Sequence, residues 1–199
     1  MGLAALALGV VIAGGLGVAA WRTHGPAYAS VTDDAGAAVG GPFTLTDANG
    51  RPVDQRVLVG KWSAVFFGYT NCPDTCPATL QALNAAGQQL GAARKDFQVV
   101  FVSVDPARDT PAQMKLYASA QGYPAGGLLA LTGTPAQVAG VAKAYHVFYA
   151  KAAGSGADYA VQHSAAIYLM DPKGRFSKPL IDSLPPKELA DQIAAAMRS

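Results

Sequence analysis

The chain has 199 residues and a formal net charge of +2. This length allows one folded domain with its own core and an additional segment. The small net charge and the lack of any Lys/Arg run exclude a charge-driven nucleic-acid partner. Two cysteines are too few for the disulfide framework of such a domain, so they form either a site or a single bridge.

Residues 1–21 are predicted to be a membrane anchor or a signal segment. Gly2 to Trp21 contain no charged side chain, and about 20 such residues can cross a bilayer. Ala27-Tyr28-Ala29 resembles a cleavage site, so a removed signal peptide is the alternative to an uncleaved anchor. Residues 22–41, rich in Ala and Gly, are predicted to be a flexible tether. In both cases we expect residues 42–199 to face a bacterial periplasm, from the inner membrane.

The first half of this domain predicts a hairpin followed by a strand–helix–strand unit. Phe43 to Thr46 alternate in polarity before the turn residues 47–50, which predicts a short N-terminal hairpin. Apolar runs at 62–69 and 97–104 have the length of buried strands. Between them a helix is predicted from Pro77 to about Gly91, and such units normally hold parallel strands.

The second half continues the alternation of strands and helices. We expect helices after Thr110-Pro111, Thr134-Pro135 and Pro185-Pro186, strands at 128–131 and 159–170, a flexible loop at 150–158, and a turn at 171–174 before an antiparallel partner strand with Phe176. This order predicts an α/β fold of three layers, α/β/α, around a mixed central sheet.

Cys72 and Cys76 lie between a buried strand and a helix. Ligands bind at this edge of open α/β sheets, and a helix N-terminus favours the thiolate that attacks disulfides or binds metals. Pro73 and Pro77 stiffen the segment. The pair can therefore close a disulfide, exchange thiols or bind a soft metal, and two inert cysteines are the remaining alternative.

A third ligand would favour a metal over redox chemistry, and the chain has three histidines. His24 belongs to the tether, and His146 ends a helix, where a surface or capping role is expected. His163 enters an apolar strand, which by itself favours a half-buried, hydrogen-bonded histidine. With the two cysteines it would form a set of two sulfurs and one nitrogen, which suits copper. Zinc competes, but structural zinc sites normally have four protein ligands.

Several sequence blocks together resemble the Sco/SenC family of membrane-anchored copper-binding proteins. The blocks are Gly60-Lys61-Trp62, Phe67 to Pro77 around Cys-x-x-x-Cys-Pro, Val102 to Pro111 around Val-Asp-Pro-x-Arg-Asp-Thr, Leu131 to Thr134, and His163-Ser164 leading to Tyr168 to Pro172. They extend over about 43–197. The resemblance implies a thioredoxin-like fold, in which the loop before the apolar strand that His163 enters faces the cysteine turn.

The resemblance also implies a copper site formed by Cys72, Cys76 and His163. It implies help in assembling the binuclear copper centre of cytochrome c oxidase subunit II, with a periplasmic copper metallochaperone as a further partner. Some family members act instead as thiol–disulfide reductases for that subunit or its metallochaperones. A thiol–disulfide oxidoreductase or redox sensor, with Cys72 attacking and Cys76 resolving, is therefore the alternative function.

Two positions depart from the family pattern. The family often has His before the first cysteine and Asp before the histidine, where this chain has Asn71 and Gln162. We therefore expect weaker or altered Cu(II) binding, with Cu(I) less affected. Asp74 either caps the helix or supplies an oxygen ligand.

Asp105, Arg108 and Asp109 form a second charged cluster. The expected role is a helix N-cap by Asp109 with an ion pair to Arg108, and the alternative is contact with a partner protein.

Two features count against a purely reductive role. The spacer between the cysteines has three residues, where thioredoxin-like reductases have two. No proline occurs between Val161 and Asp171, where those enzymes place one beside the thiols.

Overall fold

The computed structural model describes residues 31–32, 38–153 and 159–199. The anchor or signal segment predicted at 1–21 lies outside these residues, as does most of the tether predicted at 22–41. Within the described ranges, no helix combines the length and hydrophobicity that crossing a bilayer requires.

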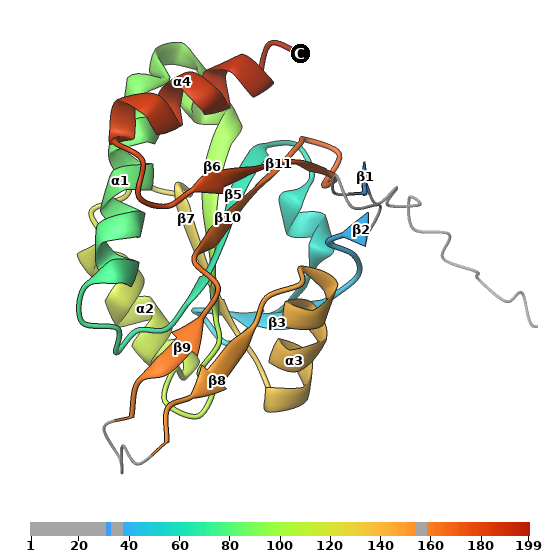
Figure 1. Cartoon of the computed structure of the whole chain (residues 1–199), viewed down its shortest axis with the longest axis vertical. Coiled ribbons are helices and arrows are strands. Elements are labelled where there is room, and N and C mark those ends of the chain that lie inside the picture. The colour runs from blue at the N-terminus through green and yellow to red at the C-terminus, as the bar shows by residue number, and fades with distance from the viewer. Residues whose placement is uncertain (1–30, 33–37, 154–158) are drawn as a thin grey trace, which may run out of the picture.

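A seven-stranded mixed sheet forms the middle layer of the domain (Figure 1). In spatial order its strands are β11 (Phe176–Ile181), β10 (Ala166–Met170), β5 (Trp62–Gly68), β6 (Phe97–Ser103), β7 (Leu128–Thr132), β3 (Thr44–Asp47) and β4 (Pro52–Asp54). The three central strands β5, β6 and β7 are parallel, and every other pair of neighbours is antiparallel. The predicted mixed sheet and N-terminal hairpin, β3–β4, are confirmed.

In the described part of the chain, four α-helices cover the two faces of the sheet. They are α1 (Thr75–Gln89), α2 (Pro111–Ala120), α3 (Pro135–Ala144) and α4 (Pro186–Ala196). Helices α1, α2 and α4 lie on one side, and α3 lies on the other (Figure 1). Right-handed crossovers explain why α1 and α2 share a side, because α1 connects the parallel strands β5 and β6 and α2 connects β6 and β7 in the same direction across the sheet. The predicted three layers are thus confirmed.

The remaining elements are short. They are the 3₁₀ turns η1 (Gln55–Leu58) and η2 (Gly91–Asp96), the strand pair β1 (Val31–Thr32) with β2 (Ala38–Val39), and the strand pair β8 (Tyr149–Lys151) with β9 (Val161–His163).

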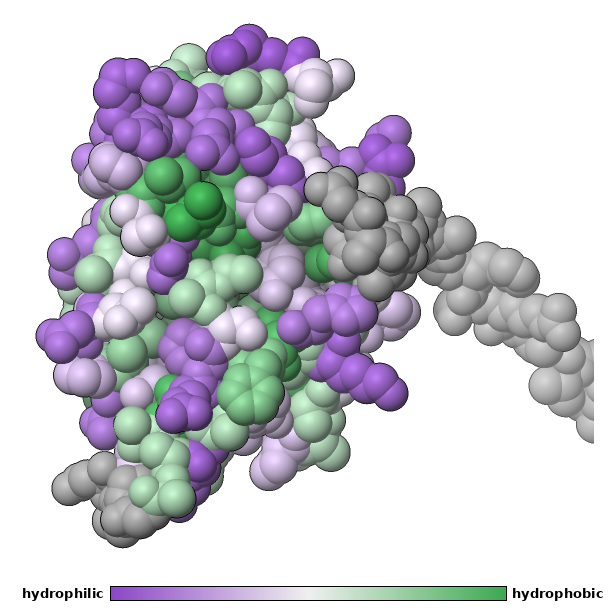
Figure 2. Space-filling view, in the orientation of Figure 1, coloured by the Kyte–Doolittle hydropathy of each residue, from purple (hydrophilic) through white to green (hydrophobic). Residues whose placement is uncertain are grey.

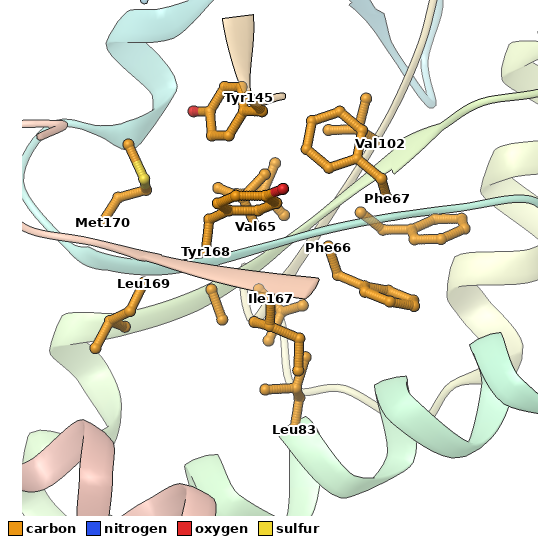
Figure 3. Close-up of a cluster of buried hydrophobic side chains, with 14 of the residues drawn as sticks. Val65, Phe66, Phe67, Leu83, Val102, Tyr145, Ile167, Tyr168, Leu169 and Met170 are labelled. Atoms are coloured by element: carbon orange, nitrogen blue, oxygen red, sulfur yellow. The ribbon is translucent and has the colours of Figure 1, made fainter. Parts of the chain in front are cut away.

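Strand β5 is buried on both faces and supplies both halves of the core. Its side chains alternate, so Phe66 lies with Leu83 and Ile167 on the α1 side, and Phe67 points to the opposite side (Figure 3). There the Phe67 ring packs against Tyr145 and Tyr168, with ring centroids 5.3 and 6.0 Å apart. Burial of large aromatic rings on both faces fixes the strand that precedes the cysteines.

Two boundaries differ from the sequence prediction. Helix α1 begins at Thr75 rather than Pro77, so Cys76 belongs to its first turn. The strand predicted at 159–170 is two strands, β9 and β10, because β9 pairs with β8 outside the main sheet and β10 pairs with β5 and β11 inside it. The loop predicted at 150–158 accordingly begins inside β8, and its residues 154–158 lie outside the described ranges.

The outer surface is polar over α4, and hydrophobic residues gather where β11 leads toward that helix (Figure 2). Large hydrophobic side chains that are exposed include Ile181, on this edge strand, and Leu116, on α2. Isolated apolar side chains of this kind are ordinary on protein surfaces and contribute little to stability.

Phe67→Ala should lower the free energy of unfolding of the chain by about 3–5 kcal/mol, because it leaves a cavity between Tyr145 and Tyr168. Urea denaturation measures the change. Leu116→Ala is the matched control and should cost less than about 0.5 kcal/mol, since Leu116 is 68% exposed. Equal effects of the two substitutions would contradict the assignment of the core.

Candidate metal centre

Three segments meet at the carboxyl edge of the parallel strands. The cysteine segment follows β5, the loop from Asp105 to Thr110 follows β6, and β9 precedes β10. Because β10 runs antiparallel to β5, its start lies at the end of β5, where Ile167 pairs with Phe66. The chain thus brings His163 to the edge that carries the cysteines, as the resemblance implied.

Cys72 and Cys76 are both free thiols with different surroundings. Cys76 is fully buried in the first turn of α1, and its backbone N–H lies 3.4 Å from the Cys72 sulfur, as a hydrogen-bond donor. Cys72 is only partly buried. The Cys72 sulfur thus lies beside the N-terminus of α1, where it is accessible to a ligand or a partner.

Burial raises the pKa of Cys76, and a hydrogen bond from the Tyr69 backbone only partly offsets this. The thiol therefore stays protonated in the metal-free protein at neutral pH. A cation that binds here must displace that proton, so metal binding and proton release are coupled.

His163 faces Cys76, with Nε2 3.6 Å from the sulfur. Its other ring nitrogen, Nδ1, lies 3.0 Å from the Ser164 carbonyl oxygen. Because a carbonyl can only accept, this contact assigns the proton to Nδ1 and leaves the Nε2 lone pair facing the sulfur. The rings of Phe66 and Tyr69 pack edge-on against the imidazole and fix its orientation.

The spacing of Cys76 and His163 fits a shared metal ion. Metal–sulfur and metal–nitrogen bonds of about 2.3 and 2.0–2.1 Å place the two ligand atoms about 3.6–3.8 Å apart at tetrahedral to trigonal angles. The observed distance of 3.6 Å between the Cys76 sulfur and His163 Nε2 falls in this range. The Cys76 thiol can donate a hydrogen bond to Nε2. A bound metal ion would take the place of that hydrogen between the sulfur and the nitrogen.

Cys72 is next to this pair but does not complete a cluster. Within the described part of the chain, no three side chains from His, Cys, Asp and Glu already converge in a metal-holding group. The Cys72 sulfur contacts the backbone of Cys76 instead. The three-ligand set Cys72, Cys76 and His163 therefore stays a prediction, of which two members are in contact.

The predicted role of Asp109 as the cap of α2 is wrong. Thr110 occupies the N-cap, and its hydroxyl accepts from the Gln113 N–H at 3.3 Å. Asp109 is fully buried and instead accepts from the Thr70 N–H at 3.1 Å and from the hydroxyls of Thr70 and Ser103, each at 2.6 Å. It thus joins the end of β6 to the segment that leads into Cys72.

The predicted ion pair of Arg108 also has a different partner. Its guanidinium binds Asp105, three residues earlier, rather than Asp109. The same guanidinium lies 3.7 Å from the ring centroid of Tyr159 and 5.7 Å from that of Tyr69.

Other candidate residues lie at the surface. Asp74 stands at the N-cap of α1 without a side-chain capping hydrogen bond, so the predicted capping bond is absent from the described structure. Asn71 and Gln162 are exposed. His146 follows α3 with a positive φ of 55° and is exposed, as expected for a surface residue. His24 lies outside the described ranges.

The sequence analysis missed two residues that shape the site. A Cβ on Gly68 would lie 2.8 Å from both the Cys76 sulfur and the Phe101 ring, so only glycine leaves room for the thiol. Tyr69 orients the His163 ring and accepts a hydrogen bond from the Val161 backbone. A glycine ending a buried strand is a signal of such close approach, whereas nothing in the sequence marks the Tyr69 contacts.

The fold and the site define a thioredoxin-like domain with two thiols and an imidazole at its ligand-binding edge. The SCO1/SenC family model matches residues 31–198, and the chain belongs to that family. The resemblance found in the sequence is confirmed.

Individual relatives agree in sequence and in fold. Protein SCO1 homolog 1, mitochondrial, from Arabidopsis thaliana is 42% identical over 143 residues, which are 71% of this chain and 42% of that protein. The structure of Bradyrhizobium japonicum ScoI with copper bound is 42% identical, with a TM-score of 0.71 over 80% of this chain and 99% of that chain. BsSco, described as having a disulfide switch and as a member of the Sco family of cytochrome c oxidase assembly proteins, is 25% identical, with a TM-score of 0.63 over 80% of this chain and 94% of that chain.

The chain spans only about half the length of several mitochondrial relatives, between 42% and 55%. What those whole proteins do is therefore a proposal for this chain.

Gly68→Ala should destabilise the chain by about 1–3 kcal/mol and displace the Cys76 thiol, because the new methyl overlaps the sulfur and the Phe101 ring. Chemical denaturation and a Cu(I) competition assay measure the two effects. The control is Gly140→Ala in α3, which meets no atom within 4 Å and should stabilise by about 0.5–1 kcal/mol. Unchanged stability and copper affinity in Gly68→Ala would contradict the close approach.

Asp109 should make the folded state less stable as pH rises. Burial raises its pKa above the ordinary value of 3.8, against hydrogen bonds from Ser103 and Thr70. Between these two pKa values the folded chain binds more protons than the unfolded chain, so this contribution to stability is lost as pH increases.

Asp109→Asn, which cannot titrate, should remove that contribution. Between about pH 3 and pH 7, the unfolding free energy of wild type should therefore decrease relative to that of the variant. Urea denaturation at a series of pH values measures it, and a constant difference contradicts the raised pKa.

Proposed function

We propose that this chain is a copper chaperone that binds copper through Cys72, Cys76 and His163 and delivers it during assembly of cytochrome c oxidase. The observation that carries the proposal is the 3.6 Å contact between the Cys76 sulfur and His163 Nε2 at the edge shared with Cys72. Family membership and the copper-bound relative from Bradyrhizobium support the choice of metal. Thiolate ligands favour Cu(I), and imidazole accepts both copper oxidation states.

The surroundings of the ligands suggest an order of events. Cys72 is the more exposed thiol and receives the ion first, next to the Cys76 N–H. Cys76 then loses its proton to solvent and binds beside His163. A partner protein takes the ion by replacing these ligands one at a time, beginning again at Cys72. Three ligands leave a position open, so no complete set of bonds has to break at once.

The cellular setting belongs to the proposal as well. The recipient is the binuclear copper centre of cytochrome c oxidase subunit II, and the donor is a periplasmic copper metallochaperone. Residues 1–21 hold the domain at the bacterial inner membrane or direct it across. Asn71 and Gln162, both exposed beside the ligands, weaken Cu(II) binding more than Cu(I) binding.

A second candidate function is thiol–disulfide exchange, favoured by the two free thiols and by the disulfide switch described for BsSco. The Cys72 thiolate attacks a partner disulfide, forming a mixed disulfide and releasing one partner thiolate. Cys76, as thiolate, then attacks the Cys72 sulfur and releases the second. The partner gains two electrons, and this chain becomes the Cys72–Cys76 disulfide. Burial raises the pKa of Cys76, so the second attack, like metal binding, requires this thiol to lose its proton first.

Anaerobic titration of the reduced chain with Cu(I), in competition with a chelator of known affinity, tests the proposal. Wild type should bind one ion. Cys72→Ser, Cys76→Ser and His163→Ala should each lose at least about tenfold in affinity, roughly 1.4 kcal/mol. His146→Ala is the matched control, since His146 is exposed on another part of the surface, and it should bind like wild type.

If His163→Ala binds Cu(I) and Cu(II) as tightly as wild type, the three-ligand site is wrong. If the metal-free chain reduces a partner disulfide at the same rate with and without His163, thiol exchange becomes the better description.

A further inference from the structure

The hairpin that carries His163 depends on contacts with the rest of the domain for its position. Strands β8 and β9 form a separate two-stranded sheet, and no main-sheet strand pairs with them in the described structure. His163 is thus not fixed by the hydrogen-bond ladder that fixes β5 and the cysteine segment. Side chains that join the hairpin to the body must set its position.

Tyr159, two residues before β9, makes several of these connections. Its hydroxyl donates to Asp105 Oδ1 at 2.6 Å. The guanidinium of Arg108 lies 3.7 Å from the centre of its ring, and the ammonium group of Lys151, on β8, lies 3.6 Å from the same centre. A charge-assisted hydrogen bond and two cation–π contacts therefore act on a single side chain.

The loop that receives Tyr159 is itself firmly held. Asp105 is 5% exposed, binds the Arg108 guanidinium, and its N–H donates to the Ser103 hydroxyl at 3.0 Å. In the same loop Asp109 holds Thr70, two residues before Cys72. The loop from Asp105 to Thr110 thus forms hydrogen bonds with both the cysteine segment and the hairpin that carries His163.

Tyr69 adds a second connection between the same two parts. Its hydroxyl accepts from the Val161 N–H on β9, and its ring packs against the His163 ring. Arg108 lies near both Tyr69 and Tyr159. Its two terminal nitrogens have no hydrogen-bond partner among the described residues. The guanidinium therefore interacts through its flat face, which packs on the two rings, and through Nε, which donates to Asp105.

We propose that Tyr159, held by Asp105 and Arg108, is a positioning residue that keeps the β8–β9 hairpin where His163 meets Cys76. Through His163 it raises the affinity of the site for Cu(I), a consequence that rests on the proposed function. Tyr159 does not touch the metal. Its loss leaves all three ligands in the chain but lets the imidazole move away from the sulfur.

The test compares Tyr159→Phe, which removes only the hydroxyl, with Tyr149→Phe. Tyr149 lies on the same hairpin, opposite His163, and its hydroxyl has no hydrogen bond within the described structure. Cu(I) affinity is measured by chelator competition for wild type, both variants, His163→Ala, and the double variant Tyr159→Phe with His163→Ala. In the metal-free chain, amide hydrogen exchange is followed at Val161 to His163 and in β5.

Tyr159→Phe should weaken Cu(I) binding about tenfold, because it removes one hydrogen bond to a charged group that holds the hairpin in place. In the His163→Ala background it should have no further effect, and Tyr149→Phe should match wild type. Exchange at residues 161–163 should accelerate in Tyr159→Phe without a change in β5. A general loss of stability would instead weaken binding in both backgrounds and accelerate exchange in β5 as well.

The inference is overturned if Tyr159→Phe binds within about twofold of wild type, or if its loss of affinity persists without His163. If wild type and His163→Ala bind Cu(I) equally, it is the proposed function that fails. The exchange measurement then still decides whether Tyr159 holds the hairpin, and unchanged exchange at 161–163 refutes that.

Discussion

The buried carboxylate of Asp109 is the constraint on which the site depends. A lone carboxylate in the interior is costly, and here it is retained because a backbone N–H and two hydroxyls bind it. Two of these donors belong to Thr70, and the third belongs to Ser103 at the end of β6. The cysteine segment is therefore fixed in place before any metal arrives, as effective binding sites require.

Much of the fold could be predicted because it depends on local pattern. The apolar runs at β5 and β6, with a helix between them, determine the parallel pair and the edge at which Cys72 and Cys76 lie. His163 could be assigned only through the family resemblance, because its own surroundings in sequence fit an ordinary half-buried histidine.

Two of the errors concern contacts between residues far apart in sequence. Residues 159–170 have the composition of one strand, and their division arises because β9 pairs with β8 while β10 pairs with β5 and β11. Asp109 precedes Thr-Pro, a pattern typical of a helix cap, but Thr110 provides the cap and releases Asp109 to bind Thr70. The secondary-structure propensities of the neighbouring residues predict neither of these contacts.

The two halves of the site differ in how much change they can accept. Around Cys76 there is no spare volume, since even a methyl group on Gly68 would overlap the sulfur. Strands β8 and β9 lie outside the main sheet and are joined to the body through side chains such as Tyr69 and Tyr159. A substitution in this strand pair can therefore shift the imidazole without disturbing the buried layers, whereas a substitution beside Cys76 cannot leave them unchanged.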